Sequence, residues 1–191
     1  MSVIRTFIAV ETSEETRSRA SSLCNSLRTS GARITWTRPE NMHLTLKFLG
    51  DTEEELLAQV KESVAAAAAR IAPFSVRFRG AGAFPDARRP QTLWIGVSEG
   101  QDSIGQLAMR IDDALHALGI PREKREFTPH LTIGRVRSGS TAEKKSLSDL
   151  IRKHAEFDAA TTEIRQVLVM ASYLSPAGPT YEVQSTAPLR N

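Results

Sequence analysis

The chain has few of the residues that cross-link proteins or anchor them in membranes. It contains one cysteine, Cys24, in 191 residues, which excludes an internal disulfide and a metal site built from several thiolates. Its apolar runs are short, and the first one ends at Val10, where acidic residues follow. A membrane-spanning helix needs about 20 apolar residues, and a signal peptide needs a longer apolar core than this. We therefore predict a cytoplasmic protein with no membrane partner.

A strong excess of charge of one sign is also lacking. The 25 Lys and Arg residues and 22 Asp and Glu residues leave a formal net charge of +3, which permits an anionic ligand without requiring one. The basic residues are dispersed rather than gathered in a tail, which disfavours wrapping of a long nucleic acid. With 40% hydrophobic residues, the chain is long enough to bury a core. A short nucleic-acid end or a small ester fits this composition better.

Only four histidines are present, and two of them belong to a repeated tetrapeptide. His-Leu-Thr-Leu at 43–46 recurs as His-Leu-Thr-Ile at 130–133, an offset of 87 residues between positions 43 and 130. In a strand, alternate side chains point to opposite faces, so each histidine and its threonine share one face while the aliphatic residues point into a core. The shared-face residues are His43, Thr45, His130 and Thr132.

These four side chains suit phosphate ester chemistry. Imidazole has an unperturbed pKa near 6.5, close to working pH. One histidine can therefore act as an acid and the other as a base, each contributing roughly 10²–10⁴-fold to the rate. A threonine hydroxyl can donate a hydrogen bond to a phosphoryl oxygen. The sequence predicts His43 and His130 as the acid/base pair, but its symmetry does not tell which is the acid.

A metal site is the main alternative for these histidines. Catalytic zinc generally takes three protein ligands, whereas neither tetrapeptide contains an acidic residue or has a second histidine four positions away. We therefore expect no metal and no cofactor. The other two histidines are predicted to be structural, with His116 on a solvated helix face and His154 at the end of a helix.

Residues near the tetrapeptides give weaker predictions. Lys47 has the same strand parity as His43, so it is a candidate for substrate contact, and a solvated surface position is the alternative. Arg135 has the opposite parity to His130, but a bulge would allow it to reach an anion. We expect the two flanking aromatic residues to pack in the core, with base stacking as the less favoured interpretation. These residues are Phe48 and Phe127.

The order of predicted elements is the same on both sides of the repeat. Each half contains a strand, a helix, a His-Leu-Thr strand, a second helix and a further strand. The expected strands are 4–10, 74–78, 92–97, 162–170 and 181–185, and the expected helices are 14–28, 53–71, 103–118 and 142–154. This pattern predicts an α+β fold, a bilobal pseudo-symmetric duplication in which two antiparallel sheets face each other across a central cleft with the helices outside. We expect 1–191 to form one domain of two interleaved lobes.

At these residues the chain resembles the 2H phosphoesterase superfamily, which is named for its two His-x-Thr-x motifs. The resemblance is greatest to the bacterial and archaeal RNA 2′,3′-cyclic phosphodiesterases, historically called 2′-5′ RNA ligases. It covers essentially the whole chain. The segments that carry it are RTFIA at 5–9, WTRPENMHLTLKFLG at 36–50, GAFP at 82–85, LWIGV at 93–97, FTPHLTIGR at 127–135 and GPTY at 178–181.

The resemblance implies hydrolysis of a terminal ribose 2′,3′-cyclic phosphate on RNA to a 2′-phosphate. It implies that His43 donates a proton to the leaving 3′ oxygen and that His130 accepts a proton from water. It also implies that Thr45 and Thr132 bind the phosphate and that Arg135 contacts the substrate. We expect a monomer without an obligate protein partner, because the duplication already supplies both halves of the site.

Other activities remain open on the sequence alone. The same residues, acting in reverse, can join a 2′,3′-cyclic end to a 5′ hydroxyl as a 2′-5′ RNA ligase, although water at about 55 M competes unless the second RNA is held nearby. A small nucleotide bearing a cyclic phosphate is another possible substrate. A non-catalytic module that binds RNA ends or nucleotides is disfavoured, because it would be expected to lack one histidine.

Overall fold

The computed structural model describes residues 3–175 and 178–190. Its strands are β1 (Val3–Glu11), β2 (Arg33–Trp36), β3 (His43–Glu53), β4 (Phe74–Phe84), β5 (Thr92–Glu99), β6 (His130–Ser138), β7 (Asp158–Ile164), β8 (Gln166–Ser175) and β9 (Gly178–Pro188). Its helices are α1 (Glu14–Arg28), α2 (Glu54–Ala68), α3 (Gln101–His116) and α4 (Thr141–Lys153), with a 3-10 turn η1 (Pro39–Asn41). The predicted alternation of strands and helices is confirmed.

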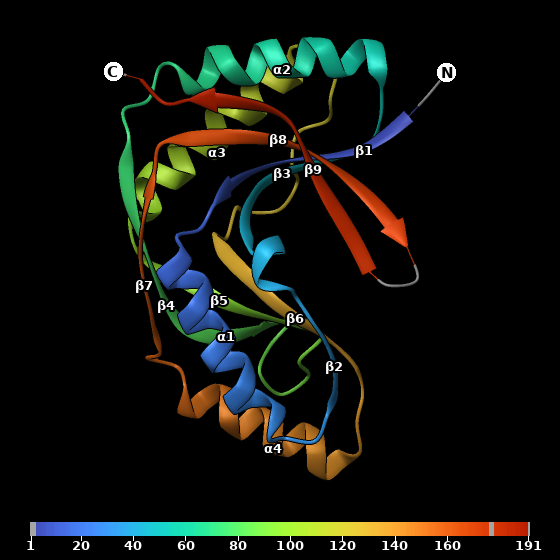
Figure 1. The fold of residues 1–191 in the computed structure, drawn as a ribbon, viewed down its shortest axis with the longest axis vertical. Helices are drawn as coiled ribbons and strands as arrows, with labels where there is room; N and C mark the ends of the chain where they lie inside the picture. Colours follow the sequence, from blue (N-terminus) through green and yellow to red (C-terminus); the bar gives the residue numbers. More distant parts are fainter. Residues whose placement is uncertain (1–2, 176–177, 191) are drawn as a thin grey trace.

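The sheet has the symmetry that the repeat predicts (Figure 1). Its strand order is β7-β4-β5-β6-β3-β1-β8-β9, with β2 paired to β6. Each lobe includes a strand from the other half of the chain, because β4 pairs with β5 and β8 pairs with β1. The two antiparallel sheets are joined at the centre by one residue pair, Leu44 with Leu131. The predicted bilobal α+β fold is confirmed, and this pair makes the two sheets continuous.

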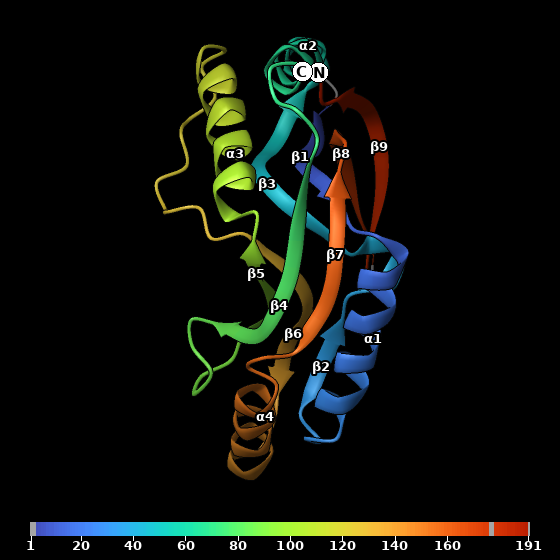
Figure 2. The same ribbon diagram turned by 90° about the vertical axis from the view of Figure 1, so that its left-hand side faces the viewer.

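The helices cover the outside of each lobe in pairs (Figure 2). Helix α1 packs on β7, β6 and α4, while α2 packs on α3, β8 and β9. The boundaries of α1 follow from its sequence. Ser13 caps its first turn by accepting from the amide of Thr16, and its inner face buries Leu23, Cys24 and Leu27. No helix in the described part of the chain is long and apolar enough to cross a membrane.

Two stretches differ from the sequence prediction. Residues 33–36, expected in a loop, form β2. The strand expected over 162–170 is two strands that separate at Arg165, because β7 pairs with β4 of one lobe and β8 pairs with β1 of the other. The apolar pattern of the sequence continues across the point where the pairing partner changes, so the sequence does not indicate that one strand ends there and another begins. The Ser-Pro-Ala-Gly-Pro sequence at 175–179 also predicts a turn, but its residues Pro176 and Ala177 lie outside the described residues.

Candidate active site

The two tetrapeptides meet where their strands pair. Leu44 of β3 faces Leu131 of β6 in an antiparallel pair, so the histidine of each motif lies on the side of the threonine of the other. Both leucines are fully buried, whereas the motif histidines and threonines are partly exposed on the opposite face. The two histidines are therefore placed diagonally across a small polar patch. The patch consists of His43, Thr45, His130 and Thr132.

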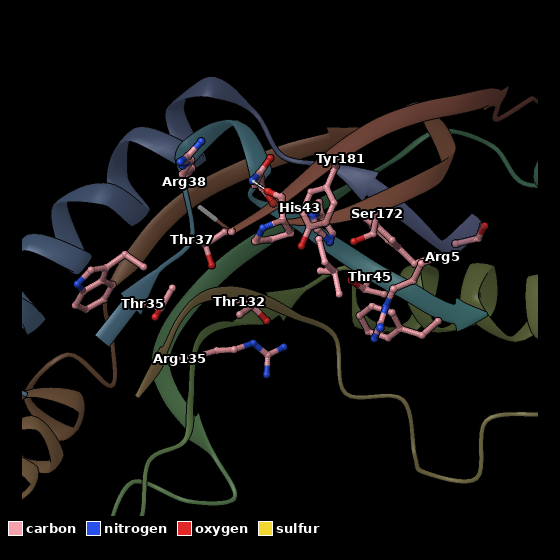
Figure 3. A pocket seen from close by; sticks show the side chains of 18 of the residues that line it. Arg5, Thr35, Thr37, Arg38, His43, Thr45, Thr132, Arg135, Ser172 and Tyr181 are labelled. Atoms are coloured by element: carbon pink, nitrogen blue, oxygen red, sulfur yellow. Dashed lines mark hydrogen bonds between the residues drawn. The ribbon is translucent and has the colours of Figure 1, made fainter. Parts of the chain in front are cut away.

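A cavity of about 440 Å³ opens beside this patch (Figure 3). His43, Thr45 and Thr132 line it, together with residues of β1, β2, β8 and β9, whereas His130 is not among the lining residues. Of the described residues that line the cavity, four are arginines and none carries a carboxylate. A cavity with this lining favours an anionic ligand. The arginines are Arg5, Arg38, Arg135 and Arg137.

Contacts on three sides fix the ring of His43. Its Nδ1 lies 2.7 Å from the carbonyl oxygen of Asn41 in the turn η1. Phe7 stacks against the ring with centroids 4.9 Å apart, and Tyr181 meets it edge-on at 5.3 Å. A carbonyl oxygen only accepts hydrogen bonds, so Nδ1 must carry a hydrogen and donate it. The other nitrogen, Nε2, is thereby left to exchange a proton with a ligand.

His130 is oriented in the same way. Its Nδ1 lies 2.7 Å from the carbonyl oxygen of Thr128, which stands 87 positions after Asn41 in the chain. Phe84 meets the ring edge-on at 4.9 Å, and Trp94 lies at 6.4 Å. The duplication therefore repeats the motif together with the carbonyl that selects the tautomer. Both histidines keep Nε2 for chemistry.

Burial makes both histidines weaker bases than usual. It lowers the pKa of His43 from 6.5 to about 4, although the hydrogen bond to Asn41 opposes this shift and the charge of His130 adds to it. Burial also lowers the pKa of His130, with the Thr128 carbonyl opposing the shift and the charge of Arg135 adding to it. Both imidazoles are therefore mainly neutral near pH 7 before an anion binds.

A bulge follows each tetrapeptide and reverses the alternation of side chains. On β3, Thr45 and Lys47 pair with consecutive residues of β1, which leaves Leu46 as the extra residue. On β6, Thr132 and Gly134 pair with consecutive residues of β5, which leaves the residue between them as the extra one. The inserted residue turns the following side chains to the opposite faces.

The bulges explain which neighbouring residues reach the cavity. Arg135 lines it despite its opposite parity to His130 in simple alternation. Phe48 lines it as well and is 66% exposed, so the core position predicted for Phe48 is wrong. Phe127, by contrast, is partly buried and packs against the core, as predicted.

Lys47 takes neither of its two expected positions. Its side chain is 4% exposed, so it is not on the surface, and it is not among the residues that line the cavity. The bulge turns it toward α3, where its Nζ contacts Asp112 and donates to the carbonyl oxygen of Pro121 at 2.7 Å. The prediction that Lys47 contacts substrate therefore disagrees with its position. Its position ties β3 to the segment that leads to β6.

This buried pair gives a stability prediction. Asp112→Ala should lower the free energy of unfolding by about 3 kcal/mol, because it leaves the buried ammonium of Lys47 without its counter-charge. Glu15→Ala is the control, since Glu15 pairs with Arg19 on the surface and should change stability by about 0.5 kcal/mol or less. Urea denaturation of both variants measures the difference. Equal losses would show that the Lys47 pair contributes no more than a surface pair.

Several cavity residues were not predicted from the sequence. Except for Arg137, which lies farther along β6, they come from β1, β2, β8, β9 and the residue that follows β2, whose approach to the tetrapeptides is a property of the folded sheet. The offset of 87 residues could have indicated Phe48, because it occupies the same place after Thr45 as Arg135 does after Thr132. The residues concerned are Arg5, Thr35, Trp36, Thr37, Arg137, Ser172 and Tyr181.

The remaining histidines lie outside the site, as predicted. His116 is exposed at the end of α3, and His154 is the C-terminal cap of α4. Within residues 3–175 and 178–190, no three His, Cys, Asp or Glu side chains are grouped so that they could hold a metal ion. Metal independence of the reaction stays a prediction, which an activity assay with a chelator can test.

A bilobal α+β fold with one His-x-Thr motif on each lobe, meeting at a basic cavity, defines a two-histidine phosphoesterase. Comparison with known proteins agrees with this class. The family model for LigT-like phosphoesterases matches the chain twice, over residues 10–94 and 95–181. The chain therefore belongs to the LigT-like phosphoesterase family.

Individual relatives match over nearly the full length. The chain is 33% identical over 186 residues to a protein of Aquifex aeolicus named RNA 2′,3′-cyclic phosphodiesterase, covering 96% of both chains. It is 34% identical over 180 residues to a protein of that name from Archaeoglobus fulgidus, covering 94% of this chain and 97% of the relative. A crystal structure of a Thermus thermophilus protein superposes with a TM-score of 0.81 at 25% identity, covering 98% of both chains.

Proposed function

We propose that the protein is an RNA 2′,3′-cyclic phosphodiesterase, which hydrolyses a terminal 2′,3′-cyclic phosphate to a 2′-phosphomonoester. The observation that carries the proposal is the pairing of Leu44 with Leu131, which brings the two His-x-Thr motifs together at a basic cavity. Relatives that cover the whole chain are named for this activity. The chain supplies both motifs itself, so we propose that it acts as a monomer.

The diagonal placement of the histidines suits an in-line displacement at phosphorus. In such a reaction the attacking and leaving oxygens lie on opposite sides of the phosphorus atom. Nε2 of His130 takes a proton from water, and the water oxygen forms a bond to phosphorus. The bond from phosphorus to the 3′ oxygen breaks, and Nε2 of His43 gives its proton to that oxygen. The resulting 2′-phosphate leaves with the charge of a monoester, and the two imidazoles exchange protons with solvent before the next turnover.

The other cavity residues bind the substrate in this proposal. Thr45 and Thr132 donate hydroxyl hydrogen bonds to the non-bridging phosphate oxygens. Arg135 carries a positive charge into the same space and has no carboxylate partner among the described residues. These donors are already in place before the reaction, so they stabilise the negative charge that develops on the phosphate oxygens. The exposed ring of Phe48 offers a surface for the base of the terminal nucleotide.

The test is an assay on a short RNA that ends in a 2′,3′-cyclic phosphate, with the products separated by the position of the phosphate. We expect a single product, the 2′-phosphate, at the same rate with and without EDTA, because two imidazoles supply both proton transfers. An equal mixture of 2′- and 3′-phosphates would refute the separate roles of His43 and His130. Loss of activity in EDTA, restored by a divalent ion, would refute the metal-free mechanism.

A second RNA with a 5′ hydroxyl, added to the same assay, tests for ligation. Hydrolysis is expected to dominate, because water is in large excess over the second RNA end. Joined RNA as the main product would make the protein a ligase that uses the same residues. Cleavage of a nucleoside 2′,3′-cyclic phosphate but not of the RNA would restrict the substrate to small nucleotides.

A further inference from the structure

The cavity extends past the motif residues along β2. Figure 3 shows Thr35 and Thr37 on one side of His43, and Arg5 and Ser172 on the other. Trp36 and Arg137 line the cavity as well. In the proposed function, one cyclic phosphate lies between the two motifs. The β2 side of the cavity is therefore left for another part of the substrate.

Strand β2 is held firmly beside the strand that carries the second motif. It pairs with β6, so that Trp36 faces Gly134, and the amide of Thr37 donates to the carbonyl oxygen of Ile133 at 3.0 Å. A side chain at position 134 would lie within about 3.1 Å of the Trp36 ring and 2.9 Å of Ile34. Glycine at that position thus allows the close approach of β2, and β2 forms a fixed wall of the cavity.

This wall carries a positive charge that no acidic side chain neutralises. Arg137 donates from Nε to the hydroxyl of Thr35 at 2.9 Å, and it forms no ion pair with a carboxylate anywhere in residues 3–175 or 178–190. Other surface arginines do form such pairs, for example Arg122 and Arg152. The bond from Nε fixes the guanidinium and leaves its terminal nitrogens as donors for an anion.

The spacing along β6 matches a nucleic-acid backbone. Arg135 and Arg137 are two residues apart on β6, so their Cα atoms are at most about 7 Å apart, on the scale of one step between successive backbone phosphates. Arg135 lies nearer to the motif and Arg137 lies farther along β6, opposite β2. Trp36 adds an aromatic surface beside them, over which the guanidinium of Arg28 lies 5.0 Å from the ring centroid. Basic side chains interleaved with an aromatic ring are typical of sites for single-stranded nucleic acid.

We propose that β2 and Arg137 form a subsite for the nucleotide that precedes the cyclic end. In this subsite Arg137 binds the phosphate that joins the last two nucleotides, and Thr35, Trp36 and Thr37 contact the penultimate nucleotide. The RNA strand leaves the active site along β2. This inference rests on the proposed function and adds to it a preference for an RNA end over a free cyclic nucleotide.

The experiment compares two substrates, a nucleoside 2′,3′-cyclic phosphate and a short single-stranded RNA with the same terminal nucleotide. The ratio of kcat/KM for the RNA to kcat/KM for the nucleotide is the quantity measured. Arg137→Ala should lower this ratio at least about tenfold, as expected for a lost hydrogen bond to a charged group. Arg137→Lys should restore part of it. Arg33→Ala is the matched control, because Arg33 is an exposed arginine on β2, paired with Ser138 next to Arg137, and does not line the cavity.

The possible results separate this inference from the proposed function. An unchanged ratio in Arg137→Ala, or an equal loss on both substrates, would overturn the subsite. The subsite is also wrong if the wild-type protein shows no preference for the RNA, or if Arg33→Ala lowers the ratio as much as Arg137→Ala does. If the wild-type protein hydrolyses neither substrate, the proposed function fails and the subsite fails with it.

Discussion

Replacing either motif histidine by alanine should remove nearly all turnover. Each imidazole is expected to carry one of the two proton transfers, and loss of such a group lowers a rate by roughly 10²–10⁴-fold. The double variant His43→Ala/His130→Ala should be little worse than either single variant, because residues that act as a unit are not additive. Measurement of kcat on RNA with a 2′,3′-cyclic end tests both statements.

Controls must separate a loss of chemistry from a loss of fold. Alanine at position 43 removes a ring that stacks on Phe7 and meets Tyr181, so His43→Gln is a useful second variant, and thermal unfolding should accompany each assay. His116→Ala should keep full activity, since His116 is exposed on α3. If a folded His43 or His130 variant retained turnover near that of the wild type, the acid/base assignment would be wrong.

The threonines should matter less than the histidines. Thr45→Ala or Thr132→Ala removes one hydrogen bond to a charged group, which is worth about 1.5–3 kcal/mol. Substitution of either histidine should therefore lower the activity more than substitution of either threonine, because the histidines transfer protons whereas the threonines only stabilise charge. A threonine variant that lost as much activity as His43→Ala would show that its hydroxyl does more than bind the phosphate.

The sequence predicted the centre of the site well because two copies of one pattern support each other. Alternation placed Leu44 and Leu131 in the core, and both are fully buried. Alternation then failed at the bulges, where one extra residue is inserted into each strand. The sequence of a bulge need not differ from that of a regular strand, so the burial of Lys47 and the exposure of Phe48 required the structure.

The rest of the cavity depends on contacts between distant parts of the chain. Tyr181 reaches His43 because β9 pairs with β8 and β8 pairs with β1. Strand β2 has only four residues, Arg33–Trp36, which is too short for a periodic pattern to be recognised. Helices such as α1 were easier to predict, since a capping serine and an apolar stripe lie within one local segment. Local patterns thus predict elements, while the walls of the site follow from sheet topology.

The pH dependence of kcat/KM should be a bell whose maximum lies on the acid side of neutrality. The active form holds one proton on the pair of imidazoles, and kcat/KM reports on that pair in the free enzyme. Burial disfavours the charged imidazole, and it lowers the pKa of His43 to about 4 and the pKa of His130 below 6.5. As the pH rises above the higher of the two values, the singly protonated form should decline about tenfold for each pH unit.

Binding of the substrate should shift this bell upward. The phosphate carries a negative charge next to both rings, and an opposite charge raises the pKa of a histidine. The profile of kcat, which reports on the enzyme–substrate complex, should therefore have its maximum at a higher pH than the profile of kcat/KM. The limbs belong to the coupled pair rather than to either residue, so the comparison to make is between the two profiles of one protein.

Removing one histidine should also remove one limb, and this tests the origin of the bell. His43→Gln leaves a single titrating imidazole, so its residual kcat/KM should follow a single ionisation instead of a bell. The stability of the fold should also depend on pH through His43. Its pKa is lowered on folding, so the unfolded chain binds more protons than the folded one, and the fold loses stability as the pH falls from about 6.5 toward 4. His43→Gln should therefore unfold less readily in acid, relative to neutral pH, than the wild type. A wild-type profile of kcat/KM that stays flat from about pH 5 to 8 would mean that proton transfer by these histidines does not limit the reaction.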